Sequence, residues 1–320
     1  MASLSILMST YNDALYVQEA VDSIIQQNYE NWELLIGDDG STDETKTILN
    51  RYEGHAKIRI FYNPVNKGKS ETINQLLEHT SGTYISVHDA DDWSEYNRFE
   101  IQVNFLESED YQMCGCDFYK HTPTGTKTVR MPRAYDDIRA KLPALSQFHG
   151  PTIVFRKDIV SEVGGLFRAF TWGEDIDFTS RVVEKYRATN IPYTLYHYRV
   201  HARSLTNDLS RLNASRFANN KLRGVLYDQR IANGSDMLME GRTQEFELLR
   251  ASIIQEMKLN SSEVYWDFSQ RLLDLGLHKE ALKSSLLAFK WEISYKNVKN
   301  VIFILLESIK QWVKNILMKK

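Results

Sequence analysis

One stretch of the chain, Tyr84–Asp92, joins an apolar run to a cluster of acids. Its first half, Tyr-Ile-Ser-Val, predicts a buried strand that runs into Asp89, Asp91 and Asp92, with only the small Ala90 between the first two acids. Carboxylates this close repel one another, which costs stability unless a cation lies among them. Ligands of open parallel sheets bind beyond the carboxyl ends of the strands. The stretch therefore predicts a divalent-metal site that holds a phosphate-bearing ligand.

The N-terminal part of the chain alternates short apolar runs with amphipathic stretches. Ser41 and Glu44 form the pattern of a capping box at the start of the second amphipathic stretch. Such alternation predicts an α/β fold with a mostly parallel, Rossmann-like sheet and helices on both faces. The predicted strands are 4–8, 32–38, 58–62, 83–88 and 113–119, and the predicted helices are 14–27, 41–52, 68–79 and 98–107.

Beyond Tyr119 the alternation loosens. Further strands are expected at 128–131, 152–155 and 193–198, and helices at 157–163 and 174–185. From Ser210 on, the periodicity is helical, and Val264–Trp291 resembles one helix-turn-helix unit of the tetratricopeptide type. A peptide-binding array needs at least three such repeats, so a packing appendage is the favoured interpretation of this pair.

The C-terminal stretch, Tyr295–Lys320, combines apolar residues at helical spacing with six lysines, which only Glu307 opposes. A basic helix with Trp and aliphatic residues on one side suits the interface of an anionic membrane. A terminal helix that packs on its own protein, with its lysines in water, explains the pattern equally well. Both interpretations stay open.

Composition limits the class of protein. The net charge of −3 argues against nucleic-acid binding, which usually needs a basic surplus. The two cysteines, Cys114 and Cys116, are spaced for neither an ordinary disulfide nor a zinc site, which favours a reducing compartment. The first predicted strand begins almost at once, and no apolar run reaches the ~18–20 residues of a membrane span. We therefore expect a cytoplasmic protein.

Polar residues follow four successive predicted strands. They are Ser9–Asn12, Asp38–Asp43, Asn66–Lys69 and the acid cluster Asp89–Asp92. Each alone is ordinary, since Asp-Gly-Ser is a turn and Ser-Thr caps helices in many proteins. Four in a row at one edge of one sheet predict a nucleotide pocket.

Six motifs occur in one order along the chain: Ser5–Asn12, Gly37–Asp43, Asp89–Asp92, Val163–Phe167, Gly173–Asp175 with Arg181, and Tyr198–His201 with Ser204 and Thr206. As a set they resemble a family-2 glycosyltransferase of the bacterial-polysaccharide type, with the type A nucleotide-sugar-binding fold. The resemblance does not extend to the helical C-terminus. It implies a catalytic domain at 1–208, with a donor half at 1–119 and an acceptor half at 120–208. A helical appendage at 209–294 and the basic amphipathic helix at 295–320 would follow.

The resemblance implies a role for each matching residue. Asp39 would accept the imide hydrogen of the base, which favours uracil or thymine over cytosine. Asp91 and His201 would hold Mn²⁺ or Mg²⁺, which suit oxygen ligands, and His201 is also a candidate pyrophosphate contact. Lys67 and Lys69 are equally explained as solvated turn residues. The full set implied to bind the donor nucleotide is Thr10, Tyr11, Asn12, Asp39, Lys67, Lys69, Asp89 and Ala90.

The resemblance also implies that Asp175 is the general base. The alternative is an N-terminal cap, because a helix dipole favours the ionised acids Glu174 and Asp175 at its start. An acceptor hydroxyl has a very high pKa, so its proton must be removed in the transition state. One base and one displacement would invert the anomeric centre. Trp93 and Trp172 would stack on sugars or are core residues. The implied supporting residues are Asp92, Trp93, Trp172, Glu174, Arg181, Arg199, Arg203 and Ser204.

The leading prediction is an inverting, metal-dependent glycosyltransferase that uses a UDP-sugar. Its acceptor would be a hydroxyl of a glycan or lipid-linked saccharide at the inner face of a membrane, where the basic helix would bind, and a homodimer stays open. A sugar-phosphate nucleotidyltransferase is the rival enzyme, but it expects a Gly-rich loop with Arg where this chain has Ser9–Asp13. A non-catalytic scaffold protein with this fold would need neither Asp91 nor Asp175.

Overall fold

The computed structural model describes residues 3–142, 147–170, 172–201, 214–258, 265–266, 269–270, 272–273, 278–291 and 295–317. The chain forms two compact units. The first consists of Met1–Lys120 and Lys127–Arg199, and the second of His121–Thr126 and Val200–Lys320.

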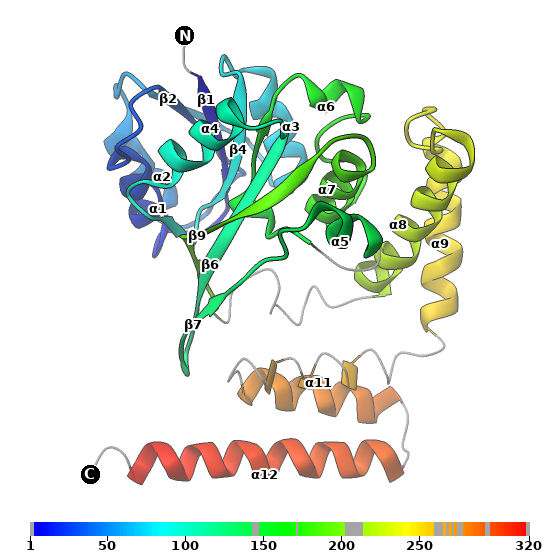
Figure 1. Cartoon of the computed structure of the whole chain (residues 1–320). Helices are drawn as coiled ribbons and strands as arrows, with labels where there is room; N and C mark the ends of the chain where they lie inside the picture. Colours follow the sequence, from blue (N-terminus) through cyan, green and yellow to red (C-terminus); the bar gives the residue numbers. More distant parts are fainter. Residues whose placement is uncertain are drawn as a thin grey trace. The chain divides into compact units, whose positions relative to one another are not determined.

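A single sheet organises the first unit (Figure 1). Its strands lie in the order β3-β2-β1-β4-β8-β6-β9-β5. The first four strands in that order are parallel neighbours. β8 then runs antiparallel to both β4 and β6, and β5 runs antiparallel to β9. The α/β fold class is confirmed, with its parallel part concentrated in the N-terminal strands. The strand bounds are β1 Leu4–Thr10, β2 Trp32–Asp38, β3 Ile58–Tyr62, β4 Tyr84–Asp89, β5 Trp93–Ser94, β6 Met113–Thr122, β7 Gly125–Val129 (paired with β6), β8 Val154–Arg156 and β9 Ala188–Arg199.

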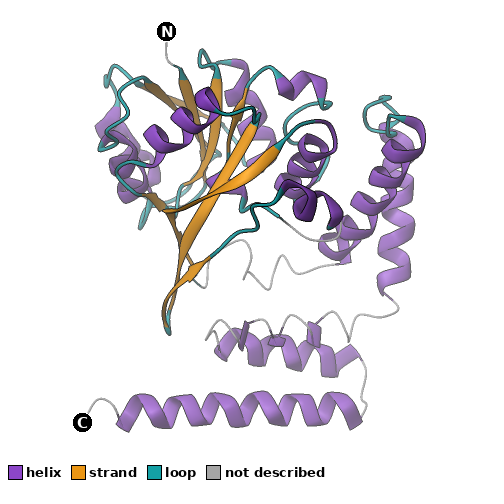
Figure 2. Cartoon of the chain, viewed as in Figure 1, coloured by secondary structure: helices purple, strands orange, loops and turns teal. Residues whose placement is uncertain are grey.

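Helices cover both faces of this sheet (Figure 2). Successive side chains of a strand point to opposite faces, and β1 shows the consequence. Ile6 belongs to one buried cluster, with α1 and α4, whereas Leu7 belongs to another, with α3, α6 and α7. The helical bounds are α1 Val17–Ile25, α2 Thr45–Leu49, α3 Lys69–Glu78, α4 Arg98–Ser108, α5 Tyr135–Ala140, α6 Ile159–Glu162 and α7 Glu174–Lys185, with 3₁₀ turns η1 Asn50–Tyr52 and η2 Gly150–Thr152.

The register brings the strand ends to one edge. Thr10 of β1 pairs with Asp38 of β2, and Ser9 of β1 pairs with Asp89 of β4. The polar segments that follow these strands therefore start side by side, as expected for the ligand-binding edge of a parallel sheet.

The capping box predicted from Ser41 and Glu44 is wrong. α2 begins only at Thr45, whose backbone N–H donates to a carboxylate oxygen of Asp43 at 3.0 Å. The Ser41 hydroxyl instead accepts a hydrogen bond from the backbone N–H of Asn12 at 2.9 Å. The Ser41 hydroxyl, predicted to cap a helix, therefore forms a hydrogen bond between two loops instead.

Helices make up most of what the structure describes of the second unit. α8 (Ala214–Asn233) packs with α9 (Thr243–Lys258), and α11 (His278–Trp291) packs with α12 (Tyr295–Leu317). The first helix of the predicted tetratricopeptide-type pair lies largely outside the described residues. In the part of the chain that the structure describes, no helix is both long and apolar enough to cross a membrane.

Candidate active site

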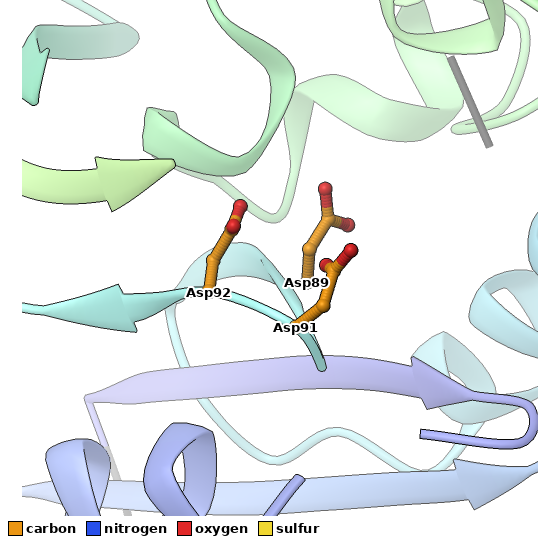
Figure 3. A group of neighbouring side chains, drawn as sticks. All are labelled: Asp89, Asp91 and Asp92. Atoms are coloured by element: carbon orange, nitrogen blue, oxygen red, sulfur yellow. The ribbon is translucent and has the colours of Figure 1, made fainter. Parts of the chain in front are cut away.

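Three carboxylates gather in the turn that follows β4, Asp89–Asp92, here called the acidic turn. Asp89, Asp91 and Asp92 each offer an oxygen, and these oxygens lie within 4.8 Å of one another (Figure 3). Burial raises the pKa of Asp92 well above its ordinary value, and the charges of Asp91 and Asp89 raise it further. A group of hard oxygen ligands with this excess of negative charge fits Mg²⁺ or Mn²⁺.

Residues at the end of β9 hold the acidic turn. The Tyr196 hydroxyl donates to Asp92 at 2.9 Å, and the backbone N–H of Arg199 donates to the other oxygen of Asp92 at 2.7 Å. The Arg199 side chain donates to the backbone carbonyl of Asp91 at 2.9 Å and pairs with Glu19 of α1 at 2.5 Å. The carboxylate of Asp92 and the backbone of Asp91 are therefore held by a strand that lies about a hundred residues further along the sequence.

Lys69, the first residue of α3, connects the acidic turn with the start of α7. Its ammonium lies 2.5 Å from a carboxylate oxygen of Asp89. Burial alone would lower the pKa of Lys69, but the charges of Asp89, Glu174 and Asp175 together raise it above its ordinary value. In turn, burial opposes ionisation of Asp89, yet the Lys69 ammonium outweighs it and lowers the pKa of Asp89. The charges of the acidic turn and of the predicted base thus both act on one ammonium group.

The start of α7 presents Glu174 and Asp175. The residue before them, Gly173, has a left-handed backbone with φ of 75°, a conformation that glycine adopts without strain. Burial, followed by the charge of Asp175, raises the pKa of Glu174 to about 7. A carboxyl group with a pKa near neutrality suits acid–base chemistry at this position.

Gly150 of η2 packs against Asp175. A β-carbon added at Gly150 would lie 2.5 Å from Oδ2 of Asp175 and 2.9 Å from its Cβ. Only a residue without a side chain therefore fits beside this carboxylate.

The loops after β1, β2 and β3 are joined by hydrogen bonds. Asn12 has a left-handed backbone with φ of 59°, and its side-chain oxygen accepts a hydrogen bond from the backbone N–H of Thr42 at 2.8 Å. Asp39 is buried and accepts hydrogen bonds from the backbone N–H groups of Lys67 at 2.9 Å and Gly68 at 2.8 Å. The predicted nucleotide-binding segments are therefore neighbours, and Asp39 also fixes the loop that leads to Lys69.

Three other predicted residues, Lys67, Arg181 and Trp93, contact protein side chains in ways that stabilise the fold. Lys67 pairs with Glu71 at 3.4 Å on the surface, where such pairs contribute little. Arg181 is buried and pairs with Asp177 at 3.0 Å. The Trp93 ring stacks on His197 with centroids 4.6 Å apart.

The remaining predicted residues lie beside the site or outside what is described. Thr10 is buried and Tyr11 is exposed, both at the end of β1. Ala90 is buried between the acids, and Trp172 is partly buried just before α7. His201 belongs to the second unit, and its role as a metal ligand stays a prediction. Arg203 and Ser204 lie outside the described residues.

Two buried residues near the acidic turn, Tyr196 and Arg98, could not be predicted from the motifs. Tyr196 fits the alternation of a strand, and Arg98 looks like an ordinary residue at the start of a helix. Tyr196 gave no local signal, because its partner Asp92 lies 104 residues away. The contacts of Arg98 with the carbonyl of Pro151 and the ring of Tyr196 are likewise distant along the chain.

Comparisons with known proteins agree with this geometry. Residues 5–164 match the description "Glycosyl transferase family 2". EpsE of Bacillus subtilis strain 168, named as a glycosyltransferase, is 33% identical over 202 residues, which cover 61% of this chain and 72% of EpsE. TuaG of the same strain, named as a teichuronic acid biosynthesis glycosyltransferase, is 27% identical over 52% of this chain and 73% of TuaG.

Among solved structures, S. aureus TarS 1–349 in complex with UDP-GlcNAc is similar. Its TM-score is 0.62 at 17% identity, covering 97% of this chain and 92% of that chain. At this identity the likeness concerns the fold, which is the glycosyltransferase type A fold.

Proposed function

The chain belongs to glycosyl transferase family 2 and is a glycosyltransferase, and from this premise we propose that it moves a sugar from a UDP-sugar to a hydroxyl group with inversion. The observation that carries the proposal is the position of Lys69. Its ammonium contacts Asp89 of the acidic turn and feels the charges of Glu174 and Asp175. A diphosphate site at the acidic turn and a base at Asp175 would therefore lie close to each other, as transfer between two bound substrates requires.

The donor is a UDP-sugar in this proposal. TarS, a protein with the same fold, was solved with UDP-GlcNAc. The segments Thr10–Asn12, Asp39 and Lys67–Lys69 would surround the nucleotide, with Asp89 and Ala90 at the ribose. Because Asp39 already accepts two backbone hydrogen bonds, the base would use its remaining acceptor capacity.

The acidic turn would hold a divalent cation, Mn²⁺ or Mg²⁺, through Asp91, with Asp89 and Asp92 beside it. When bound, the cation neutralises the charge that grows on the departing diphosphate. The chain's own contribution is to hold the carboxylates in place through Tyr196 and Arg199.

Asp175 would take the proton of the acceptor hydroxyl. Its position at the start of α7 favours the ionised form, because the positive end of the helix dipole faces it. A general base of this kind contributes typically ~10²–10⁴ in rate. A single displacement with one base inverts the anomeric centre. Glu174, which keeps its proton more readily, would support Asp175.

The acceptor would be a glycan or lipid-linked saccharide. TuaG, a relative, is named for the biosynthesis of such a polymer. We assign the catalytic domain to residues 1–208, a helical appendage to 209–294 and a basic helix to 295–320. α12 exposes apolar side chains, among them Ile302, Leu306 and Ile309, and its sequence is rich in lysine. These properties support peripheral binding to an anionic membrane at its cytoplasmic face.

A donor panel tests the proposed function. The protein is incubated with UDP-, TDP-, GDP- and CDP-sugars in the presence of Mn²⁺, and the released nucleotides are separated by chromatography. We expect UDP from at least one UDP-sugar. Release of pyrophosphate from a nucleoside triphosphate and a sugar phosphate would instead identify a nucleotidyltransferase. Release of no nucleoside diphosphate from any donor would contradict the proposal.

A further inference from the structure

Arg98 is a buried cation that donates hydrogen bonds to neutral acceptors. It lies at the start of α4 with 0% of its surface exposed, and among the described residues it forms no ion pair. Moving an unpaired charge out of water is expensive, so every one of its hydrogen bonds matters. Its side chain donates to Gln102 at 2.9 Å, Ser94 at 3.0 Å, Ser86 at 3.1 Å and the backbone carbonyl of Pro151 at 2.8 Å.

These acceptors lie on both sides of the acidic turn. Ser86 belongs to β4, which leads into the turn, and Ser94 belongs to β5, which leaves it. The guanidinium also lies over the ring of Tyr196, 4.9 Å from its centroid, and the Tyr196 hydroxyl donates to Asp92. One side chain therefore contacts the entry to the turn, its exit and a residue that holds one of its acids.

A chain of hydrogen bonds continues from Arg98 to the backbone of Asp89. The carbonyl of Asp89 can only accept, so Nδ1 of His88 donates to it, at 2.8 Å. Nε2 of the neutral ring then accepts from the Ser94 hydroxyl, at 3.0 Å. That hydroxyl in turn accepts from Arg98. Arg98 donates to Ser94, Ser94 donates to His88, and His88 donates to the carbonyl of Asp89, so Arg98 sets the direction of every hydrogen bond in this series.

The fourth acceptor, the backbone carbonyl of Pro151, connects Arg98 with the segment beside Asp175. It follows Gly150 in η2, and the backbone of Gly150 packs directly against the carboxylate of Asp175. The turn is rigid, because the backbone N–H of Thr152 donates to the carbonyl of His149 at 2.8 Å. A shift of η2 would therefore move the surface on which Asp175 rests.

We propose that Arg98 is a positioning residue of the transfer reaction, whose buried guanidinium holds the acidic turn and η2 in one arrangement. It thereby sets the geometry between the diphosphate site and Asp175 without touching a substrate. The proposal rests on the proposed function, because it gives the acidic turn and Asp175 their roles. An apolar side chain would fill the same space, but it would leave Ser86, Ser94 and Pro151 without their common donor.

The test uses the full chain with the substitution Arg98→Met. Mn²⁺ binding is measured by electron paramagnetic resonance, and kcat by release of the nucleoside diphosphate at saturating donor. Loss of a residue that orients ligands typically costs 10–100-fold in metal affinity or activity, and we expect losses of roughly that size in both readouts. Arg230→Met is the matched control, because Arg230 is also buried but pairs with Asp236 in the second unit. It should lower the melting temperature while Mn²⁺ affinity and kcat stay as in the wild type.

Ser94→Ala keeps the proposal testable if Arg98→Met does not fold. It breaks the hydrogen-bonded connection between Arg98 and His88 by removing one hydroxyl. Ser108→Ala, at the exposed end of α4, is its control. We expect weaker Mn²⁺ binding for Ser94→Ala only. Added guanidinium ion should also restore part of the kcat of Arg98→Ala.

Two outcomes separate the inference from the proposed function. Wild-type Mn²⁺ affinity and kcat in folded Arg98→Met, or in Ser94→Ala, would overturn the role of Arg98 alone. A wild-type protein that binds no Mn²⁺ would overturn the metal site, and with it the inference.

Discussion

A single methyl group at position 150 tests whether the position of Asp175 controls the reaction. In Gly150→Ala, the new Cβ would lie 2.5 Å from Oδ2 of Asp175, whereas ordinary contact begins at 3.4 Å, so the carboxylate has to move by about 0.9 Å. The Cβ of Asp175 would itself lie at 2.9 Å, so rotation of the carboxylate alone does not remove the clash. A misplacement of about 1 Å costs roughly 10²-fold in rate.

The assay measures nucleoside diphosphate release at saturating donor, together with the donor KM and the melting temperature. We expect kcat to fall ~10²-fold with an unchanged KM, because Gly150 contacts Asp175 rather than the nucleotide loops. The loss of stability should lie within the ~1–3 kcal/mol typical of overpacking, since Cβ of Asp175 has to shift as well as its carboxylate.

Gly224→Ala is the matched control for this prediction. Gly224 lies inside α8 with no atom within 4 Å of an added Cβ, so alanine there should leave kcat unchanged. It should also raise stability by about 0.5–1 kcal/mol. Full activity in folded Gly150→Ala would refute the reasoning that ties turnover to the placement of Asp175.

The remaining predictions concern the metal, a carboxylate and the C-terminal helix. Excess chelator should abolish transfer, and added Mn²⁺ or Mg²⁺ should restore it; full activity in chelator would remove the cation from the account. The raised pKa of Glu174, about 7 in the folded state, means that the folded protein binds more protons than the unfolded chain between about pH 4.5 and 7. Stability should therefore fall as pH rises through this window, and urea denaturation should show a smaller fall in Glu174→Gln; parallel curves would contradict the assignment. Replacing the exposed Ile302 and Leu306 of α12 with glutamate should stop the protein from floating with anionic vesicles, while transfer to a soluble acceptor continues; equal flotation would leave α12 a packing helix.

Much of the first unit could be predicted from local pattern. The apolar runs that form β1 and β2, alternating with amphipathic helical stretches, were enough to predict a parallel sheet with a ligand-binding edge. α7 begins and ends where its apolar spacing predicts, at Glu174 and Lys185. These features depend on residues that are close along the chain.

Contacts between segments that are distant along the chain could not be predicted from local patterns. β8 pairs with β4 and β6 although it follows both in sequence, and nothing local in Val154–Arg156 selects those neighbours. The capping box failed for the same reason, since Asn12 uses the hydroxyl of Ser41.

In the candidate site, too, residues that are adjacent in sequence could be predicted and contacts between distant residues could not. The acidic turn could be predicted because its carboxylates are adjacent in sequence, and the structure brings them within 4.8 Å. The place of Lys69 could not, because it depends on how the start of α3 meets the acidic turn and the start of α7, more than a hundred residues later. The need for glycine at position 150 could not be predicted either, because it depends on the carboxylate of Asp175 that packs against it.

The central claim is that the acidic turn serves the diphosphate while Asp175 serves the acceptor. Calorimetric titration of UDP, with and without Mn²⁺, into Asp91→Asn and Asp175→Asn separates these roles most directly. The account predicts that Asp91→Asn loses the Mn²⁺-dependent part of UDP affinity, whereas Asp175→Asn keeps it. Mn²⁺-dependent UDP binding that survives in Asp91→Asn, or disappears in Asp175→Asn, would contradict it.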